Sequence, residues 1–580
     1  MQTAKRLNLA VITLRRSPTA GTFSRPHERL ALGRQIVTLK GFSMTRSMEQ
    51  NANVARFLPR MAVTSPDTVA VRAPKGHLKD GSICYRSCTF GELERASQAV
   101  GAALAARGIT RGTRTLLLVR PGLDLIQICF ALFKLGAIPI VIDPGMGLKS
   151  FLSCVRRSEP TAMVGIPVAI LLSRVFRQAF ASVSTRVCIG RTGAPALLGR
   201  SLEPVLSDPD ELAAVLFTSG STGAPKGVCY THGMFDAQVR LIRDTYQIAP
   251  GEVDLPMLPI FALFNPALGM TTIVPEMNPS RPATVDPARI VRAIHQNQVT
   301  NSFGSPVLWT RIAAYCERNG HRLPSLRRVL LAGAPVPPDL LRRLQALTPN
   351  GEMHTPYGAT ECLPVSTISA REVLADTWGK TETGAGTCVG RPLGGVSAKI
   401  IESVDESISS WAQVNELSDG TIGEILVTGP SVTRTYDRLP EATARAKIID
   451  PQGTVWHRMG DLGYRDAEGR LWFCGRMVER VETESGTLFT DQVEGIFNRH
   501  PQIVRSALIG LGQAPNQTAA VVVERAPGSS LTVADLRKIA ASQPLTAGIE
   551  TFFFHKKFPV DVRHNAKIHR LTLKRLFERS

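Results

Sequence analysis

The chain has 580 residues, of which 43% are hydrophobic and 20% are charged. This length exceeds what a single core usually organises, so we expect two or more domains, and the composition excludes a disordered or fibrous protein. The formal net charge of +20 is compatible with anionic substrates, with peripheral contact at an anionic membrane surface, or with an ordinary basic surface. No arginine-rich helix or basic stripe with interleaved aromatic residues is present, so we expect no nucleic-acid partner.

The first 43 residues are rich in lysine and arginine and contain one acid, Glu28. Two interpretations remain open for this segment. It is typical of an organelle transit peptide, and it is equally typical of upstream sequence from a start site placed too early, because Met44 and Met48 precede the first domain-like pattern. Under either interpretation we expect a disordered extension.

From about residue 50 the chain alternates strand and helix patterns. Strands are expected at residues 115–119, 138–142, 213–217, 300–303 and 327–331. Helices are expected at residues 123–135, from a Thr231 cap to about Tyr246, at residues 287–296, and from about Pro338. Repeated strand–helix–strand units predict parallel sheets covered by helices.

The apolar stretch at residues 123–142 is interrupted by Asp124, Gln127 and Lys134. It therefore predicts a buried helix followed by a buried strand, and we expect no transmembrane segment. The ten cysteines are scattered without a C-x-x-C pair or zinc-site spacing, which favours buried thiols and a cytoplasmic location.

After about residue 475 the pattern changes to a smaller α+β unit. Strands are expected at residues 507–511, 519–523 and 551–555, and a helix at residues 533–541. The domains we expect are an extension at residues 1–43, a large domain at residues 44–475 and a small C-terminal domain at residues 476–580.

Residues 216–227 (LFTSGSTGAPKG) are the most informative segment of the chain. An expected buried strand leads into a loop of small hydroxylated residues and glycines, whose N–H groups and hydroxyls can bind phosphate oxygens, while Lys226 adds a positive charge. The candidate phosphate-binding residues are Thr218, Ser219, Gly220, Ser221, Thr222, Gly223 and Lys226. The spacing is not that of a Walker A loop, and a plain exposed turn is the alternative that the length of the pattern disfavours.

This loop resembles the signature of the adenylate-forming superfamily, which includes acyl-CoA synthetases, luciferases and the adenylation domains of peptide synthetases. Further segments match that family in order: residues 130–144 (FALFKLGAIPIVIDP), 333–335 (GAP), 357–361 (YGATE), 460–461 (GD), 475–476 (GR) and 559–570 (PVDVRHNAKIHR). The resemblance implies an α/β large N-terminal domain with two helix-flanked sheets and a β subdomain, followed by a small mobile α+β C-terminal domain.

The resemblance also implies ATP and Mg²⁺ as cofactors and assigns roles to individual residues. Gly333, Ala334 and Pro335 would pack against adenine, and Tyr357 would stack on it. Gly358 and Ala359 would belong to the same ATP-binding motif, Thr360 would contact the α-phosphate, and Glu361 would hold Mg²⁺. Asp461 would accept a ribose hydroxyl beside Arg476, Lys226 would hold the leaving pyrophosphate, and Lys567 would be the catalytic lysine. These residue types suit the chemistry, because a carboxylate attacking the α-phosphorus of ATP needs positive charge around the phosphoryl oxygens.

Within this superfamily, the chain departs from the acyl-CoA synthetases at Ala262, where a His or aromatic gate is usual, and at Val478, the expected hinge residue. Residues 254–278, 304–306, 332–338, 355–364, 384–390 and 560–567 resemble the β-lactone synthetases of bacterial long-chain olefin biosynthesis. That resemblance implies a 2-alkyl-3-hydroxy fatty acid whose β-hydroxyl displaces AMP, and other enzymes of a hydrocarbon pathway as partners. The acyl pocket would include Phe261, Ala262, Phe264, Gly304, Ser305 and Pro306.

Two other functions remain open at this point. A long-chain acyl-CoA ligase would need coenzyme A to form product, whereas intramolecular lactone formation would not. A catalytically silent adenylate-binding or assembly protein would release no pyrophosphate, and the presence of Lys226, Glu361, Asp461 and Lys567 together disfavours it.

Overall fold

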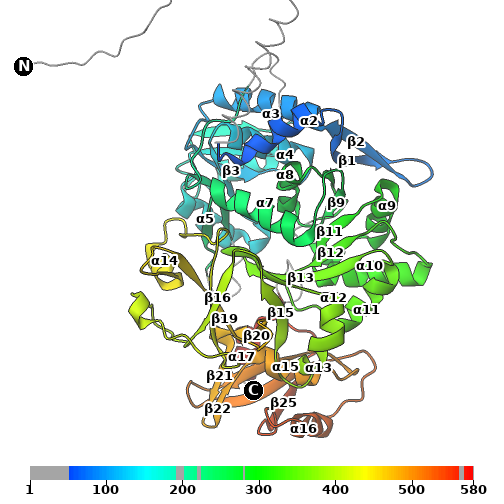
Figure 1. The fold of residues 1–580 in the computed structure, drawn as a ribbon, viewed down its shortest axis with the longest axis vertical. Coiled ribbons are helices and arrows are strands. Elements are labelled where there is room, and N and C mark those ends of the chain that lie inside the picture. The colour runs from blue at the N-terminus through cyan, green and yellow to red at the C-terminus, as the bar shows by residue number, and fades with distance from the viewer. Residues whose placement is uncertain (1–50, 191–201, 218–223, 279–280, 561–566, 579–580) are drawn as a thin grey trace, which may run out of the picture. The chain divides into compact units, whose positions relative to one another are not determined.

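The computed structural model describes residues 51–190, 202–217, 224–278, 281–560 and 567–578 (Figure 1). The expected extension at residues 1–43 and the loop at residues 218–223 lie outside the described residues. Residues 52–580 form one unit, which is described below.

A six-stranded sheet forms the first half of this unit. Its strands run in the order β6 (Thr185–Cys188), β5 (Ala162–Gly165), β3 (Arg114–Leu118), β4 (Ile138–Val141), β7 (Leu212–Phe217) and β8 (Gly227–Thr231). All neighbours pair in parallel except β8, which is antiparallel to β7. The helices of this half are α2 (Phe57–Thr64), α3 (Phe90–Ala105), α4 (Leu123–Lys134), α5 (Leu148–Ser158), α6 (Pro167–Val175) and α7 (His232–Tyr246).

Both faces of this sheet are covered by helices. Neighbouring residues of a strand point to opposite faces, so the sheet packs against helices on both sides. In β3, Leu117 packs with α4 in one hydrophobic cluster, and Leu116 packs with α5 and α6 in another. The predicted strands and helices of this region are confirmed to within a residue or two, including the Thr231 cap, whose side chain accepts a hydrogen bond from the Met234 amide.

A second, fourteen-stranded sheet occupies the middle of the described chain. Its main path is β16 (Ser397–Ile401), β17 (Gly423–Thr428), β19 (Val455–Arg465), β20 (Leu471–Arg476), β15 (Thr387–Pro392), β14 (Cys362–Ser369), β13 (Glu352–Ala359), β12 (Arg328–Leu331), β11 (Asn301–Gly304), β9 (Val253–Pro256), β10 (Thr271–Ile273), β1 (Val69–His77) and β2 (Ile83–Thr89), with β18 (Lys447–Ile449) beside β19. The expected β subdomain corresponds to the strands β15 to β20. Hydrogen bonds between β14 and β15 join these strands to the rest of the large sheet.

The second sheet is also covered on both faces. Val329 and Leu331 of β12 pack against α9 (Pro287–Asn297), α10 (Pro306–Asn319) and α11 (Pro338–Leu347), whereas Leu330 joins the cluster that contains Leu117 of the first sheet. One hydrophobic cluster is thus shared by the two sheets, and it fixes how their strand ends face each other. The other helices here are α8 (Asn265–Leu268), α12 (Ala370–Glu372), α13 (Trp378–Thr381) and α14 (Pro440–Ala446).

The strands of the large sheet end at Arg476, where the domain boundary is predicted. The chain continues into the hairpin of β21 (Val481–Thr483) and β22 (Gly486–Leu488) and a three-stranded sheet of β23 (Ile503–Leu511), β24 (Thr518–Arg525) and β25 (Thr551–Phe554). Its helices are α15 (Thr490–Asn498), α16 (Val533–Ala541) and α17 (Arg570–Phe577). Arg570 holds α17 in place by donating to both carboxylate oxygens of Glu494 and to Glu479.

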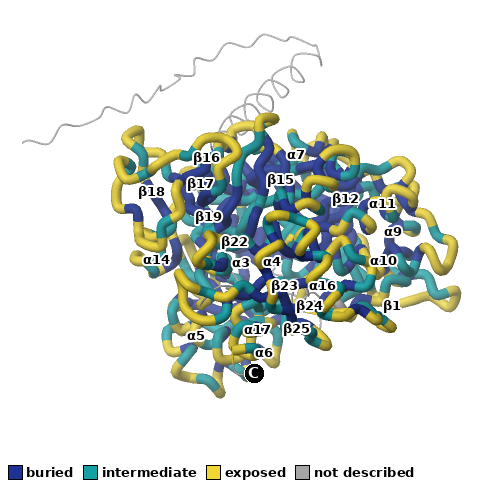
Figure 2. The backbone as a smooth tube through the Cα atoms, turned by 90° about the horizontal axis from the view of Figure 1, so that it is seen from below, coloured by how far each residue is buried: buried dark blue, intermediate teal, exposed yellow. Residues whose placement is uncertain are grey.

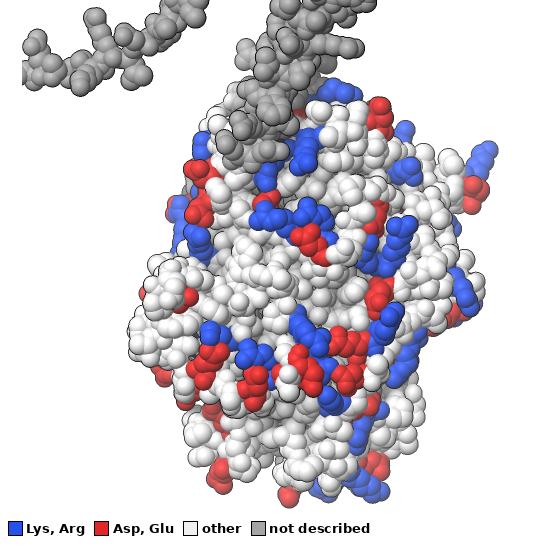
Figure 3. Space-filling model, in the orientation of Figure 1, with Lys and Arg blue, Asp and Glu red and all other residues white. Residues whose placement is uncertain are grey.

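The surface carries charges of both signs. Figure 3 shows Lys and Arg interspersed with Asp and Glu over the visible face, so no continuous basic stripe appears there. In the described part of the chain, no helix is both long enough and apolar enough to cross a bilayer.

Candidate active site

A cavity of about 1670 Å³ is lined by residues of both sheets and of the chain that follows Arg476, which is called the C-terminal unit below. Its walls come mainly from the segments that follow β3, β4, β9 and β13, at the carboxyl ends of these strands. Ligands of α/β proteins usually bind at this edge, because the loops there converge while the strands behind them stay rigid.

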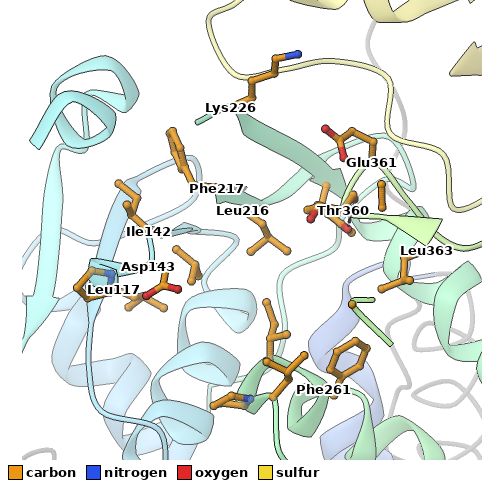
Figure 4. A pocket seen from close by; sticks show the side chains of 18 of the residues that line it. Leu117, Ile142, Asp143, Leu216, Phe217, Lys226, Phe261, Thr360, Glu361 and Leu363 are labelled. Atoms are coloured by element: carbon orange, nitrogen blue, oxygen red, sulfur yellow. Dashed lines mark hydrogen bonds between the residues drawn. The ribbon is translucent and has the colours of Figure 1, made fainter. Parts of the chain in front are cut away.

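One end of the cavity is polar. Figure 4 shows Lys226, Thr360 and Glu361 gathered on one side of the cavity and Phe261 on the opposite side, with Leu216 between them. Arg476 and Lys567 line the cavity too, so Lys226 and Lys567 line one cavity although they are 341 positions apart in sequence. This set of cations beside a carboxylate is suited to binding a phosphate chain and its metal ion.

Two tyrosines that the motifs did not indicate hold this polar end. The Tyr436 hydroxyl donates to Glu361 Oε1 at 2.8 Å, and its ring centroid lies 4.7 Å from Lys226 Nζ. The Tyr230 hydroxyl donates to the Thr360 carbonyl oxygen at 2.5 Å. Because Glu361 Oε1 is used by Tyr436, its second oxygen is the one suited to a metal ion.

The described residues contain no group of three or more His, Cys, Asp or Glu side chains that could hold a metal by themselves. Mg²⁺ is commonly bound by one or two carboxylates together with substrate phosphates and water. Glu361, which lines the cavity together with Lys226, therefore fits this kind of site.

Asp461 lies on β19 opposite Arg476 of β20 and beside Tyr357 of β13. The Tyr357 hydroxyl donates to Asp461 Oδ2 at 2.5 Å, and Arg476 Nη1 lies 2.8 Å from Oδ1. No donor in the described chain is aligned to make a hydrogen bond with Oδ1, which is buried. Burial raises the pKa of Asp461, and the Arg476 guanidinium opposes that shift. A buried acceptor without an aligned donor, next to cavity residues Gly460 and Arg476, is suited to a ligand hydroxyl.

The opposite end of the cavity is apolar. Phe261 and Ala262, two of the residues proposed for an acyl pocket, line it, and the Phe261 ring stacks on Phe303 with centroids 4.2 Å apart. Phe264 lies behind Phe261, where both border a small separate cavity.

The predicted Gly304, Ser305 and Pro306 are buried but are not among the residues that line the main cavity. The reason is close packing, since a Cβ on Gly304 would come within 2.4 Å of the Met257 side chain, which itself lines the cavity. The absence of a side chain on Gly304 therefore leaves room for the Met257 side chain.

The other predicted residues divide into three groups. Gly333, Gly358, Ala359 and Val478 line the cavity, whereas Ala334, Pro335, Tyr357 and Asp461 lie beside it. Thr218, Ser219, Gly220, Ser221, Thr222 and Gly223 fall outside the described residues. Val478 is 53% exposed and follows β20 directly, at the start of the C-terminal unit.

A buried lysine and a buried histidine also belong to this region, and sequence reasoning missed them. Lys447 donates to Thr433 Oγ1 at 3.3 Å, and burial lowers its pKa to about 8 although the Glu361 carboxylate opposes the shift. His457, the strand partner of Lys447, lines the cavity with Nδ1 3.1 Å from the Ala446 carbonyl oxygen. These strand segments also carry other polar residues, such as Arg458 directly after His457, so the sequence offered no clear signal for Lys447 or His457.

The tautomer of His457 follows from its partner, because a carbonyl oxygen only accepts and Nδ1 must donate. Burial and the Lys447 ammonium lower the pKa of His457 well below its ordinary value, so the ring stays neutral. Lys447 therefore adds positive charge close to Glu361 and Lys226, and His457 presents a neutral ring beside it.

A cation-lined cavity between two α/β sheets, with a lysine supplied by a C-terminal α+β unit, defines the class of adenylate-forming enzymes. The sequence profile of the AMP-binding enzyme family matches residues 58–437. The chain is 45% identical to an olefin beta-lactone synthetase of Xanthomonas campestris, over 89% of this chain and 96% of that protein. It is 44% identical to an olefin beta-lactone synthetase of Stenotrophomonas maltophilia, over 90% of this chain and 97% of that protein. The chain thus belongs to the AMP-binding enzyme family, in the branch that contains these synthetases.

Solved structures show the same fold at lower identity. ATP-bound MatB from Rhodopseudomonas palustris superposes with a TM-score of 0.73 at 22% identity, covering 91% of this chain and 99% of that chain. The amide bond synthetase McbA from Marinactinospora thermotolerans superposes with a TM-score of 0.74 at 22% identity, covering 90% and 99%. These structures share the large α/β domain and the small C-terminal domain, which confirms the predicted fold class.

Proposed function

We propose that the protein activates a 2-alkyl-3-hydroxy fatty acid with ATP and closes it to a β-lactone. The carboxylate oxygen bonds to the α-phosphorus of ATP as pyrophosphate leaves. The β-hydroxyl oxygen then bonds to the carbonyl carbon, AMP leaves as the C–O bond to phosphate oxygen breaks, and the hydroxyl proton passes to phosphate or solvent. The products are β-lactone, AMP and pyrophosphate. The observation that carries this proposal is the 44–45% identity to two olefin beta-lactone synthetases over about nine-tenths of the chain.

The polar end of the cavity suits the first step. Lys567 would neutralise charge between the carboxylate and the α-phosphate, and Lys226 would hold the departing pyrophosphate. Thr360 would bind the α-phosphate, and Asp461 Oδ1 would accept a ribose hydroxyl. Mg²⁺ held by Glu361 and phosphate oxygens would supply Lewis-acid stabilisation of the leaving group.

The second step uses a nucleophile that the substrate already carries. Holding the hydroxyl near the activated carbonyl replaces a bimolecular encounter, which is worth on the order of 7–11 kcal/mol and helps to offset the strain of a four-membered ring. The apolar end of the cavity, with Phe261 and Ala262, would hold an alkyl chain so that the hydroxyl stays in reach of the carbonyl.

The product balance tests the proposal. Purified protein is incubated with Mg-ATP and a 2-alkyl-3-hydroxy fatty acid without coenzyme A, and the product is identified by its carbonyl infrared band and by NMR. We expect a β-lactone with one AMP per lactone. An acyl-adenylate that turns over only after coenzyme A is added would contradict lactone closure and establish an acyl-CoA ligase.

Replacing Ala262 by Phe tests the position of the alkyl chain. Ala262 is buried and lines the apolar end, so a larger side chain there should displace several methylene groups of a long substrate. We expect kcat/KM to fall roughly 10- to 100-fold for a long-chain hydroxy acid and much less for a short-chain one. Thermal unfolding measures the packing cost, about 1–3 kcal/mol. An equal loss for short and long chains would mean that Ala262 does not contact the chain.

A further inference from the structure

Helix α6 carries an apolar stripe that faces solvent. Val168, Leu171 and Val175 are 61%, 61% and 66% exposed, and their spacing places them on one side of the helix. The opposite side of α6 packs into the first sheet through Ala169 and Ile170, so the helix is apolar on both sides. Large apolar side chains exposed together commonly mark an interaction surface.

The stripe is continuous with the rim of the active-site cavity. Val168 lines that cavity, as does Leu148, which begins α5 and is 51% exposed. Helices α5 and α6 contribute to one hydrophobic cluster and lie at the same edge of the molecule in Figure 2, where both carry much exposed chain. Val168 therefore belongs both to the exposed stripe and to the cavity lining.

Most of the charges around the stripe are positive. Between residues 143 and 178 the sequence has five Lys or Arg and two acids, Asp143 and Glu159, and the Glu159 carboxylate pairs with Arg438. Lys149, Arg174 and Arg177 are exposed, and no described carboxylate lies within ion-pair distance of them. This segment contrasts with the mixed charges on the face in Figure 3.

We propose that α6 and the start of α5 dock on an anionic lipid bilayer, from which a long-chain carboxylic acid enters the cavity. The exposed stripe would be buried among acyl chains while Lys149, Arg174 and Arg177 contact lipid phosphates. An apolar face and a basic face together give stronger membrane binding than either alone. The evidence for docking is the exposed apolar and basic surface, whereas the transfer of a long-chain acid rests on the proposed function.

Vesicle binding tests the docking. The full-length protein is sedimented with vesicles of phosphatidylcholine containing phosphatidylglycerol, and with vesicles of phosphatidylcholine alone. We expect binding to the anionic vesicles that weakens at high salt, and at least tenfold less bound protein with the neutral ones. Absence of binding to anionic vesicles overturns the proposal.

The double variant Leu171→Ser/Val175→Ser locates the surface, because neither residue lines the cavity. The matched control is Val63→Ser/Ile449→Ser, which removes two other exposed apolar side chains, 81% and 62% exposed. We expect the first variant to lose vesicle binding about tenfold and the control to bind like the wild type. Equal binding of both variants contradicts the assignment to α6. A wild-type dimer that the α6 variant converts to a monomer, with no vesicle binding, would show a protein partner instead.

Activity on a short, water-soluble hydroxy acid without vesicles keeps the two proposals separate. Both variants should form product at the wild-type rate. If no lactone forms with any of the three proteins, the proposed function fails, while the vesicle data still decide the docking.

Discussion

Replacing Lys567 by Ala should lower the rate of adenylation by roughly 10²–10³-fold, the usual cost of removing one group that stabilises charge in a transition state. Lys567 comes from the C-terminal unit and lines the cavity that Lys226 and Glu361 also line. Its ammonium would act on charge that develops as the carboxylate bonds to the α-phosphorus, so the loss should appear in kcat more than in the KM for ATP. Substrate-dependent release of pyrophosphate measures the effect.

The matched control for this variant is Lys556→Ala, which removes an exposed lysine of the same C-terminal unit. The control should keep the wild-type rate. Supplying the synthetic acyl-adenylate bypasses the first step, and Lys567→Ala should then form lactone at close to the wild-type rate. If the variant adenylates normally, or if it fails equally on the preformed adenylate, Lys567 does not have the proposed role.

Replacing Asp461 by Asn should be the second severe change. The Asp461 carboxylate accepts a hydrogen bond from the Tyr357 hydroxyl and forms an ion pair with Arg476. The variant therefore loses the negative charge that balances the largely buried Arg476 guanidinium. Hydrogen bonds to charged groups contribute about 1.5–3 kcal/mol, so we expect kcat/KM for ATP to fall roughly 10- to 100-fold. Loss of the ion pair should also lower the free energy of unfolding, by about 1–3 kcal/mol because Arg476 keeps partial contact with solvent.

A nucleotide without ribose hydroxyls separates binding from stability. The wild type should prefer ATP over 2′,3′-dideoxy-ATP, and Asp461→Asn should lose most of that preference. The control Asp419→Asn removes an exposed carboxylate that pairs with Arg465 at 2.7 Å, and it should keep the wild-type preference. An unchanged preference in Asp461→Asn would show that this carboxylate does not contact the ribose.

Local signals in the sequence were enough to place most elements. Helix α16 (Val533–Ala541) covers the predicted residues 533–541, because Thr532 and Asp535 form a capping box at its start and Leu536 and Ala540 supply the buried side. The strand at β7 was predicted for a similar reason, since its apolar run ends at the loop of small residues. These signals act over a few residues and need no knowledge of distant contacts.

Contacts between segments that are far apart in the chain were harder to predict from the sequence. The hydrogen bonds between β14 and β15 make the β subdomain part of the large sheet, and no local pattern indicates that pairing. Gly304 was predicted to line the acyl pocket, but Met257 lies across it because residues 47 positions apart in the chain meet in neighbouring strands. The family pattern marked a segment and could not say which of its side chains face the cavity.

The sequence by itself determined the fold class and the class of chemistry, because motif residues keep their local spacing on strands and loops. Only the tertiary structure decided which groups meet. Lys447 and His457 are neighbours because β18 pairs with β19, and Tyr436 contacts Glu361 from 75 positions away. The apolar stripe of α6 beside the cavity rim also emerged only on folding, because exposure depends on what the rest of the chain covers. Such effects arise from packing among segments that are far apart in sequence, and a linear pattern does not record them.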